Sequence, residues 1–105
     1  MTKCVEIVSW EHQYLPEETR LREQLSNEGY SVFLWADSAG TSYPPHRHEV
    51  DESIWVLNGE ISFGIGGKEY ALKSGDRLIL PAGTEHTASI PGSEKCFYLV
   101  GQKNE

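Results

Sequence analysis

The chain has 105 residues, enough for one domain that buries its own core and too few for two. Nine basic residues against sixteen acidic ones give a formal charge of −7, and the pI is near 5.0. This balance argues against a nucleic-acid backbone or an anionic membrane surface as partner, because both require clustered Lys and Arg. A small anionic substrate stays compatible with this charge, since a bound metal ion can reverse the field inside a cleft.

The N-terminal region predicts no targeting segment. Residues 1–10 contain one Lys and a broken apolar pattern, and no run in the chain is long enough to span a bilayer. We therefore expect a cytoplasmic protein. Cys4 and Cys96 lie near opposite ends of the chain in alternating apolar contexts and without C-x-x-C spacing. This arrangement predicts two reduced, half-buried thiols in strands.

Residues 1–29 are expected to form a strand and a helix that pack on the rest of the domain. Apolar and polar residues alternate over 3–10, which predicts a strand, and Pro16 followed by acidic residues predicts a helix from about residue 16 to 28. Leu21 and Leu25 lie one turn apart on one face of this helix, and Gly29 supplies a C-terminal stop. No Ser, Thr, Asp or Asn stands at the expected N-cap, so the sequence does not fix the first residue of the helix.

The remainder of the domain, residues 30–105, predicts an all-β barrel. Short runs rich in β-branched and aromatic residues are separated by Gly, Pro and Asn turns every 6 to 10 residues. The expected strands are 30–36, 53–57, 60–65, 68–72, 77–80, 84–90 and 96–100. With the N-terminal strand they number about eight, a pattern typical of an antiparallel sandwich or barrel. Gly59, Gly75 and Gly83 stand at three of the turns, where a positive φ is expected.

Four side chains predict a site for one divalent metal ion. His46 and His48 are spaced i, i+2, so on a strand both would point to the same face. Glu52 follows at an even offset and would share that face if the strand continued without a bulge. His86 lies far along the chain, after a Pro-Ala-Gly corner. Three neutral imidazoles and one carboxylate bind first-row ions such as Fe, Mn, Ni or Zn, and the set does not choose among them.

Two motifs of fixed spacing contain these four residues. The first is Gly40, five residues, His46, one residue, His48, three residues, Glu52, six residues and Gly59. The second is Gly75, five residues, Pro81, one residue, Gly83, two residues and His86. In this order, and fifteen residues apart, they resemble the two consensus elements of the cupin superfamily. One position departs from the pattern, because Ile90 stands where the second element has an Asn that is not a ligand.

The resemblance implies a small single-domain cupin. Its fold would be a double-stranded β-helix (jelly-roll) barrel with a short N-terminal helix, often assembled as a homodimer, with one divalent metal inside the barrel mouth. On the motif positions, the metal ligands would be His46, His48, Glu52 and His86. The motifs identify no catalytic acid or base.

Other side chains near the motifs receive structural interpretations. Arg47 and Glu85 alternate away from the ligand side and are expected on the surface, and Asp51 is expected to be a solvated charge. His12 stands before the helix and outside both motifs, and Tyr43 is expected to pack as a loop aromatic. Aromatic residues that could line an apolar pocket, or equally fill the core, are Phe33, Trp35, Trp55 and Tyr98.

The leading hypothesis is a metal-dependent enzyme that acts on a small organic molecule, either dioxygenase-like or isomerase- or lyase-like. Cupins with many reactions share the metal motif, so it does not choose between these classes. The alternative is a non-catalytic module that binds or senses a small molecule, and a third interpretation is a barrel with a vestigial site. The expected partners are a small-molecule ligand and a second copy of the chain, with neither nucleic acid nor membrane.

Overall fold

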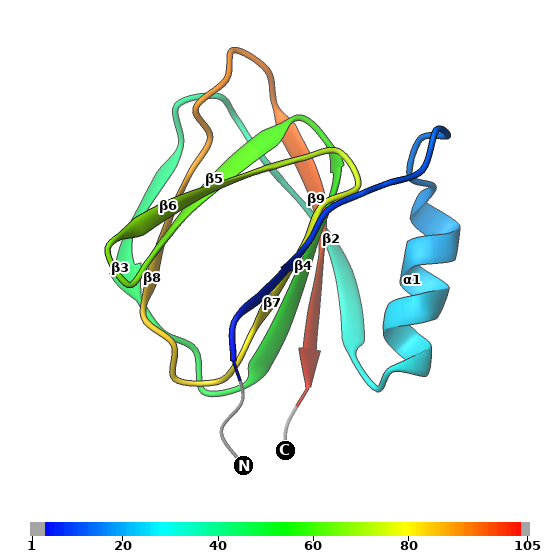
Figure 1. Ribbon diagram of the computed structural model, residues 1–105, viewed down its shortest axis with the longest axis horizontal. Coiled ribbons are helices and arrows are strands. Elements are labelled where there is room, and N and C mark those ends of the chain that lie inside the picture. Colours follow the sequence, from blue (N-terminus) through cyan, green and yellow to red (C-terminus); the bar gives the residue numbers. More distant parts are fainter. Residues whose placement is uncertain (1–3, 104–105) are drawn as a thin grey trace.

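The computed structural model describes residues 4–103, which form one helix and two antiparallel sheets that face each other (Figure 1). The elements in chain order are β1 (Glu6–Val8), α1 (Glu18–Asn27), β2 (Ser31–Asp37), β3 (Ser42–His46), β4 (Asp51–Asn58), β5 (Glu60–Ile65), β6 (Lys68–Lys73), β7 (Arg77–Leu80), β8 (His86–Ser89) and β9 (Cys96–Lys103). This arrangement confirms the expected all-β fold with one short N-terminal helix. The helix is too short and too polar to cross a membrane.

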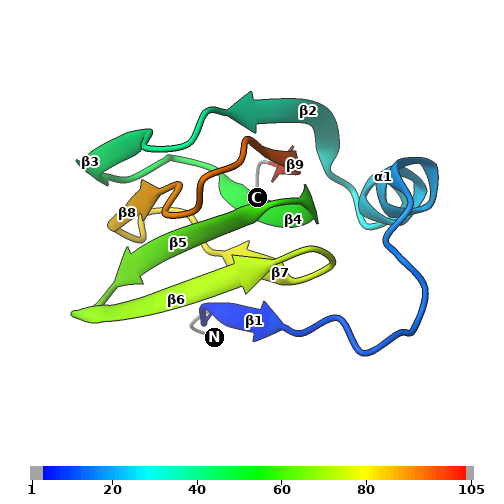
Figure 2. The ribbon, with the colours of Figure 1, turned by 90° about the horizontal axis from the view of Figure 1, so that it is seen from above.

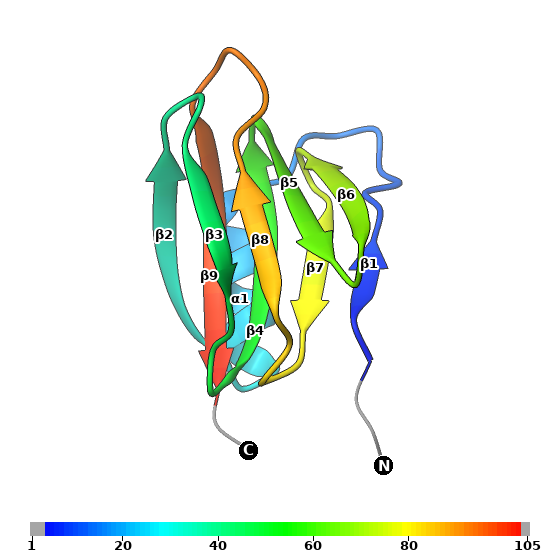
Figure 3. The same cartoon turned by 90° about the vertical axis from the view of Figure 1, so that its left-hand side faces the viewer.

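The two sheets are built from strands that alternate between them along the chain. The larger sheet has the order β1-β7-β4-β9-β2, and the smaller sheet has the order β3-β8-β5-β6 (Figures 2 and 3). From β2 onward the chain crosses between the sheets at almost every turn, which is the topology of a double-stranded β-helix. Strands β2 and β3 are consecutive in sequence but do not pair with each other. Each pairs with one other strand, and the two form free edges on the same side of the molecule.

Strand β3 is the one strand of the described residues that the sequence pattern did not predict. Its sequence is Ser-Tyr-Pro-Pro-His, and two prolines argue against a strand because proline has no N–H to donate to a neighbour. The structure accommodates them because β3 pairs only with β8 and leaves its other side unpaired. The register of this pair shifts between Tyr43 and His46, where the prolines lie.

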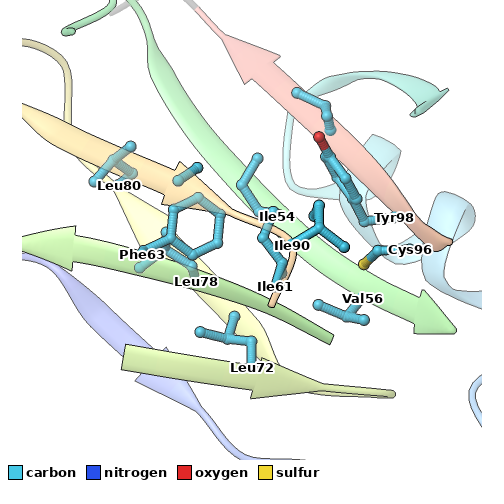
Figure 4. Packing of buried hydrophobic residues seen from close by; sticks show 12 residues of the cluster. Ile54, Val56, Ile61, Phe63, Leu72, Leu78, Leu80, Ile90, Cys96 and Tyr98 are labelled. Carbon is cyan, nitrogen blue, oxygen red and sulfur yellow. The ribbon is translucent and has the colours of Figure 1, made fainter. Parts of the chain in front are cut away.

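The hydrophobic core lies between the two sheets (Figure 4). Alternation along β5 directs Ile61 and Phe63 inward, and both are almost fully buried. Facing them from the larger sheet are Ile54 and Val56 of β4. Strand β4 is buried on both faces, because its outer face is covered by the helix.

Helix α1 packs on the outer face of the larger sheet through Leu21 and Leu25, which are 4% and 0% exposed (Figure 2). It begins two residues later than expected, and Glu17 at its N-cap makes no side-chain cap hydrogen bond. At its C-terminal end Gly29 has a φ of +99°, in agreement with the expected stop. The helix therefore reaches the sheet through the two leucines that the sequence pattern identified.

Arg77 of β7 fastens the end of α1 to the sheet. Its guanidinium group donates two hydrogen bonds to Glu28, at 2.5 and 3.3 Å, and a third to the hydroxyl of Ser53 at 2.7 Å. The same group lies 4.7 Å from the centroid of the Trp55 ring. An arginine that is 6% exposed is thus fully paired, as the cost of burying a charge requires.

The N-terminal strand is shorter than the alternation of residues 3–10 predicted. Strand β1 covers three residues and pairs only with β7, and residue 3 lies outside the described range. Cys4 precedes this strand and is exposed, so the expectation of a half-buried strand thiol is wrong there; Cys96, the first residue of β9, is fully buried. Both thiols are free; Cys4 precedes the edge strand β1, whereas Cys96 belongs to the core cluster between the sheets.

The three glycines expected at turns all have positive φ, at +96° for Gly59, +91° for Gly75 and +82° for Gly83. Gly75 has a second reason to lack a side chain, since a Cβ there would overlap the Trp10 ring. Trp10 is held in place by its backbone N–H, which donates to Asp76 at 2.9 Å.

Candidate metal centre

Three histidines from two segments of the chain converge at one end of the space between the sheets. His46 is the last residue of β3 and His86 the first of β8, and the two are direct partners in the antiparallel pair. His48 follows two residues later in the loop that leads to β4. One ring nitrogen from each of the three lies within 4.8 Å of the others, a spacing that one ion could bridge.

Two of the three rings have their tautomer fixed by the backbone. The Nδ1 of His46 lies 2.7 Å from the carbonyl oxygen of Pro44, and the Nδ1 of His86 lies 2.9 Å from that of Thr84. A carbonyl oxygen can only accept, so Nδ1 carries the hydrogen in both rings and Nε2 keeps its lone pair. Outer hydrogen bonds of this kind orient metal-binding histidines and set which nitrogen coordinates.

The surroundings of His86 favour its neutral form. Its ring is buried, and burial lowers the pKa of His86 below its ordinary value, because the imidazolium would lose its hydration. The backbone carbonyl of Thr84 opposes this effect, while the nearby His46 and His48 rings add to it. Only the neutral ring can act as a metal ligand, so the site presents His86 in the competent state at neutral pH.

Glu52 reaches the same end of the cavity from the opposite sheet. Its carboxylate is 5% exposed on β4, with Oε1 at 3.6 Å from the Nε2 of His48. The other oxygen, Oε2, accepts a hydrogen bond of 2.6 Å from the side chain of Gln102 on β9. The carboxylate therefore lies beside the histidine cluster in a fixed orientation, and its coordination of the ion as a fourth ligand stays a prediction.

The expected route by which these residues share one face is wrong. His46, His48 and Glu52 would share one face only if the strand continued without a bulge, but β3 ends at His46 and the chain bends at residues 49 and 50 before β4 begins. Strand β4 belongs to the other sheet, so the even offset in sequence does not bring Glu52 beside the histidines. Glu52 and the histidines lie close together because only a short loop connects β3 in one sheet to β4 in the other.

Backbone contacts hold the two histidine-bearing segments together. The N–H of Gly83 donates to the carbonyl oxygen of His48 at 2.8 Å, and the N–H of Ala82 donates to the Asp51 carboxylate at the same distance. Asp51 is 6% exposed, so the expectation of a solvated charge is wrong. Its carboxylate lies against the loop before His86, where it accepts the Ala82 N–H, rather than in water.

The other predicted side chains fall outside the cluster. Arg47 and Glu85 form an exposed pair on the surface, as expected, with side chains 63% and 61% exposed. His12 lies against Trp10 and Tyr14 beside the helix, apart from the three histidines. Trp55 packs under the helix on the outer face of the larger sheet and contributes to the second core cluster rather than to the cavity.

A cavity of about 250 Å³ extends from the histidine cluster between the sheets. Its lining is mainly apolar and aromatic, and comprises Phe33, Trp35, Tyr43, His46, His48, Glu52, Ile54, Ile61, Phe63, Leu80, His86, Ala88, Tyr98, Val100 and Gln102. Phe33 and Trp35 remain 40% and 48% exposed, because they lie on the free edge strand β2. The cavity is therefore bordered by solvent along the gap between β2 and β3.

Three aromatic residues of this lining share one carboxylate that the sequence reading did not single out. Asp37 accepts hydrogen bonds from the Tyr43 hydroxyl at 2.7 Å, the Tyr98 hydroxyl at 2.6 Å and the Trp35 indole N–H at 3.2 Å. Tyr43 is thus a strand residue of the cavity wall, not a loop aromatic. Asp37 lies one residue beyond the strand expected at 30–36, although its alternation with Phe33 and Trp35 indicates its inward direction.

The donor set fits a divalent first-row transition ion. Two Nε2 atoms have their lone pairs free, a third imidazole adjoins them, and a buried carboxylate stands within reach of the group. Nitrogen-rich sets of this kind suit Fe, Mn, Ni and Zn rather than Ca or Mg, which prefer oxygen. The structure supports a metal site without specifying its ion.

The comparisons with known proteins agree with this architecture. Residues 33–101 match the family model described as Cupin domain. The quercetin 2,3-dioxygenase of Bacillus subtilis is 36% identical over 59 residues, which is 55% of this chain but 18% of that protein. The chain thus spans less than a fifth of this curated relative's length.

Solved structures show the same fold. The DMSP lyase DddQ of Ruegeria pomeroyi superposes with a TM-score of 0.65 at 26% identity, over 72% of this chain and 39% of that one. The polyketide cyclase RemF of Streptomyces resistomycificus superposes with a TM-score of 0.62 at 24% identity, over 73% of this chain and 58% of that one. The match to the family model covers more than half of the chain, and with the two sheets it shows that this protein belongs to the cupin family.

Proposed function

We propose that this protein is a metal-dependent enzyme that acts on a small organic molecule bound in the cavity beside the three histidines. The observation that supports this proposal most is that the cluster of His46, His48 and His86 opens directly into that cavity. A volume of about 250 Å³ is below the usual range for drug-sized ligands and suits a substrate of one ring or a short chain.

The residues of the chain would divide the work between holding an ion and shaping the cavity. When bound, a divalent ion would supply either activation of dioxygen or Lewis-acid polarisation of a substrate oxygen. Gln102 holds the Glu52 carboxylate toward His48, and apolar side chains such as Phe63 and Leu80 keep the cavity wall free of competing polar groups. A water-poor wall strengthens the electrostatic interactions between the site and its ligand.

Both reaction classes have support among the similar proteins. One is named as a dioxygenase, quercetin 2,3-dioxygenase, and another as a lyase, the DMSP lyase DddQ. The chain covers a small part of each of those proteins, so the reaction class is left as these two alternatives.

Metal content is the measurement that tests the proposal. Wild-type protein, reconstituted with Fe, Mn, Ni or Zn and desalted, is expected to retain about one ion per chain by elemental analysis. The His46→Ala/His86→Ala variant should lose the ion because two ligands are removed, while His12→Ala, which deletes a histidine outside the cluster, should retain it. Glu52→Gln should weaken metal affinity by roughly tenfold or more if the carboxylate coordinates or orients a ligand.

Circular dichroism of each variant provides the folding control. A folded wild-type protein that retains none of the four ions would contradict the proposal. Equal metal content in the wild type and the double variant would contradict it as well, because the ion would then lie elsewhere.

A further inference from the structure

The inward-facing residues of the larger sheet form a polarity gradient along the cavity. The strands β4, β9 and β2 lie side by side, and their registers define four successive levels. Glu52 is level with Gln102, and Ile54 with Val100 and Phe33. Val56 is level with Tyr98 and Trp35, and Cys96 with Asp37. Each step is two residues along a strand, about 6.6 Å, so the level of Tyr98 lies roughly 13 Å from the level of Glu52. Tyr43 and Tyr98 belong to the cavity wall and Asp37 lies behind them, so the wall changes from the metal-binding end, through an apolar middle, to two phenols that are bonded to a carboxylate.

Asp37 is surrounded by donors. Three side chains donate to its carboxyl group, two to Oδ1 (Trp35 and Tyr43) and one to Oδ2 (Tyr98), and it is 8% exposed. Three donors with no acceptor are the environment of a carboxylate anion. Within residues 4–103 no ion pair joins Asp37 to a Lys, Arg or His, so its charge is offset by hydrogen bonds alone.

The hydrogen bonds to Asp37 decide what the phenols can offer a ligand. A phenol has one hydrogen, and Tyr43 and Tyr98 have both given theirs to Asp37. The pKa of Tyr43 is raised, mainly by its hydrogen bond to Asp37 and to a smaller extent by burial. The pKa of Tyr98 is also raised, mainly by burial and to a smaller extent by the Asp37 carboxylate. Both phenols therefore keep their hydrogens at neutral pH. What remains toward the cavity is the oxygen lone pairs, which can only accept.

No positive charge compensates for these acceptors. The residues that line the cavity include no Lys or Arg, and the indole N–H of Trp35, the donor nearest to the phenols along β2, is already bonded to Asp37. A carboxylate placed at this end would meet acceptors and a buried negative charge, which is a costly arrangement. A hydroxyl or a protonated amine would instead find acceptors backed by an anion, among aromatic rings that also attract cations.

We propose that the end of the cavity walled by Tyr43 and Tyr98, with Asp37 behind them, selects the far end of the substrate, accepting a group that donates hydrogen bonds and rejecting a second carboxylate. Asp37 is then a specificity-determining residue that acts through Tyr43 and Tyr98. This inference rests on the proposed function, because the metal-binding end would hold the other, anionic or chelating, end of the same molecule.

A matched series of 3-phenylpropanoates tests this selectivity on the zinc-loaded protein, in which zinc is redox-inert. The four probes carry a para hydroxyl, aminomethyl, methyl or carboxyl group, and their binding is measured by isothermal titration calorimetry. The hydroxyl and aminomethyl probes should bind at least about fivefold more tightly than the methyl probe, and the carboxyl probe should bind most weakly.

Two variants, Asp37→Asn and Tyr43→Phe, and one control, Glu11→Gln, assign the selectivity to Asp37. Asp37→Asn removes the negative charge, so the advantage of the aminomethyl probe and the disadvantage of the carboxyl probe should both shrink toward onefold. Glu11→Gln removes one negative charge outside the cavity and should leave all four affinities unchanged. Tyr43→Phe, at a half-buried position, keeps the Asp37 charge but deletes one acceptor, together with one of the three hydrogen bonds to Asp37, and should lower the advantage of the hydroxyl probe by about fivefold.

The outcomes separate this inference from the proposed function. Equal affinities for the four probes, or tightest binding of the carboxyl probe, overturn the selection by Asp37 while leaving the metal-dependent function standing. Selectivity that survives in both Asp37→Asn and Tyr43→Phe also overturns it. Failure of the wild-type protein to retain any of Fe, Mn, Ni or Zn contradicts the proposed function itself, whereas absence of binding by any probe to zinc-loaded protein overturns this inference alone.

Discussion

His46 and His86 illustrate how single residues gain their chemical role from neighbours two positions away. Each donates its Nδ1–H to a backbone carbonyl, so the ring is held in one tautomer before any ion arrives. Burial determines the chemistry of other residues in the same way. Cys96 is fully buried beside Asp37, and burial first, then the nearby carboxylates, raises the pKa of its thiol to about 11.

The two thiols should therefore differ in reactivity. Thiolate is the reactive form, so at about pH 8 a thiol reagent such as DTNB is expected to modify the exposed Cys4 promptly and Cys96 only after unfolding. Absorbance should report one prompt thiol per chain in the native protein and two in denaturant. The Cys4→Ser variant should show none before denaturation, and a second prompt thiol in native wild type would contradict the burial of Cys96.

At the scale of elements, the attachment of α1 depends on an interaction that the helix sequence does not contain. Leu21 and Leu25 supply the apolar contact, but the end of the helix is fixed by Arg77, some fifty residues away in sequence. Hydrogen bonds from Arg77 lower the pKa of Glu28 below the ordinary 4.5, and burial opposes this shift in part. The ion pair therefore contributes stability above the unfolded-state pKa and loses it as the pH falls through the lower, folded-state pKa.

Glu28→Gln should destabilise the protein at neutral pH but not in acid. The expected loss is about 1 kcal/mol at pH near 7, a modest value because the Glu28 side chain is 37% exposed. Urea unfolding at several pH values should show the difference from wild type shrinking below pH 4.5. The control Glu17→Gln removes an exposed pair with Arg20 and should have no measurable effect, and a loss that persists in strong acid would contradict the ion-pair explanation.

At the scale of the whole molecule, four large apolar side chains are partly exposed at or beside the free edge formed by β2. Phe33 and Trp35 border the cavity with 40% and 48% of their surfaces exposed, and Leu34 and Phe97 lie on the outer face with 41% and 37% exposed. A seven-residue edge strand that contains no Lys or Pro is poorly protected against pairing. We propose that a second copy of the chain covers this edge, as the expected homodimer.

Sedimentation at micromolar concentration is expected to give twice the chain mass of 11.8 kDa. Leu34→Lys places a charge on the outer face of β2 and should shift the protein toward the monomer while zinc content is unchanged. Leu15→Lys is the matched control, because Leu15 is 82% exposed in the segment before α1, away from this edge. A monomer mass for the wild type would contradict the assembly.

Much of the fold follows from local sequence patterns. Turn residues predicted the positive φ at Gly59, and helical spacing predicted the shared face of Leu21 and Leu25 that the structure buries. These features were predictable because each depends on residues a few positions apart. Strand β3 was not predicted, since its two prolines are tolerated only on an edge, and an edge is defined by the whole sheet.

The sequence by itself determined which residues can bind a metal and the family to which the motifs belong, because side-chain chemistry and spacing are written in the chain. Only the tertiary structure decided how Glu52 approaches the histidines, that Asp51 is buried, and that Asp37 collects three donors from β2, β3 and β9. These arrangements depend on how the two sheets face each other. A hydrogen bond between residues such as Asp37 and Tyr98, 61 positions apart, leaves no local pattern from which it could be read.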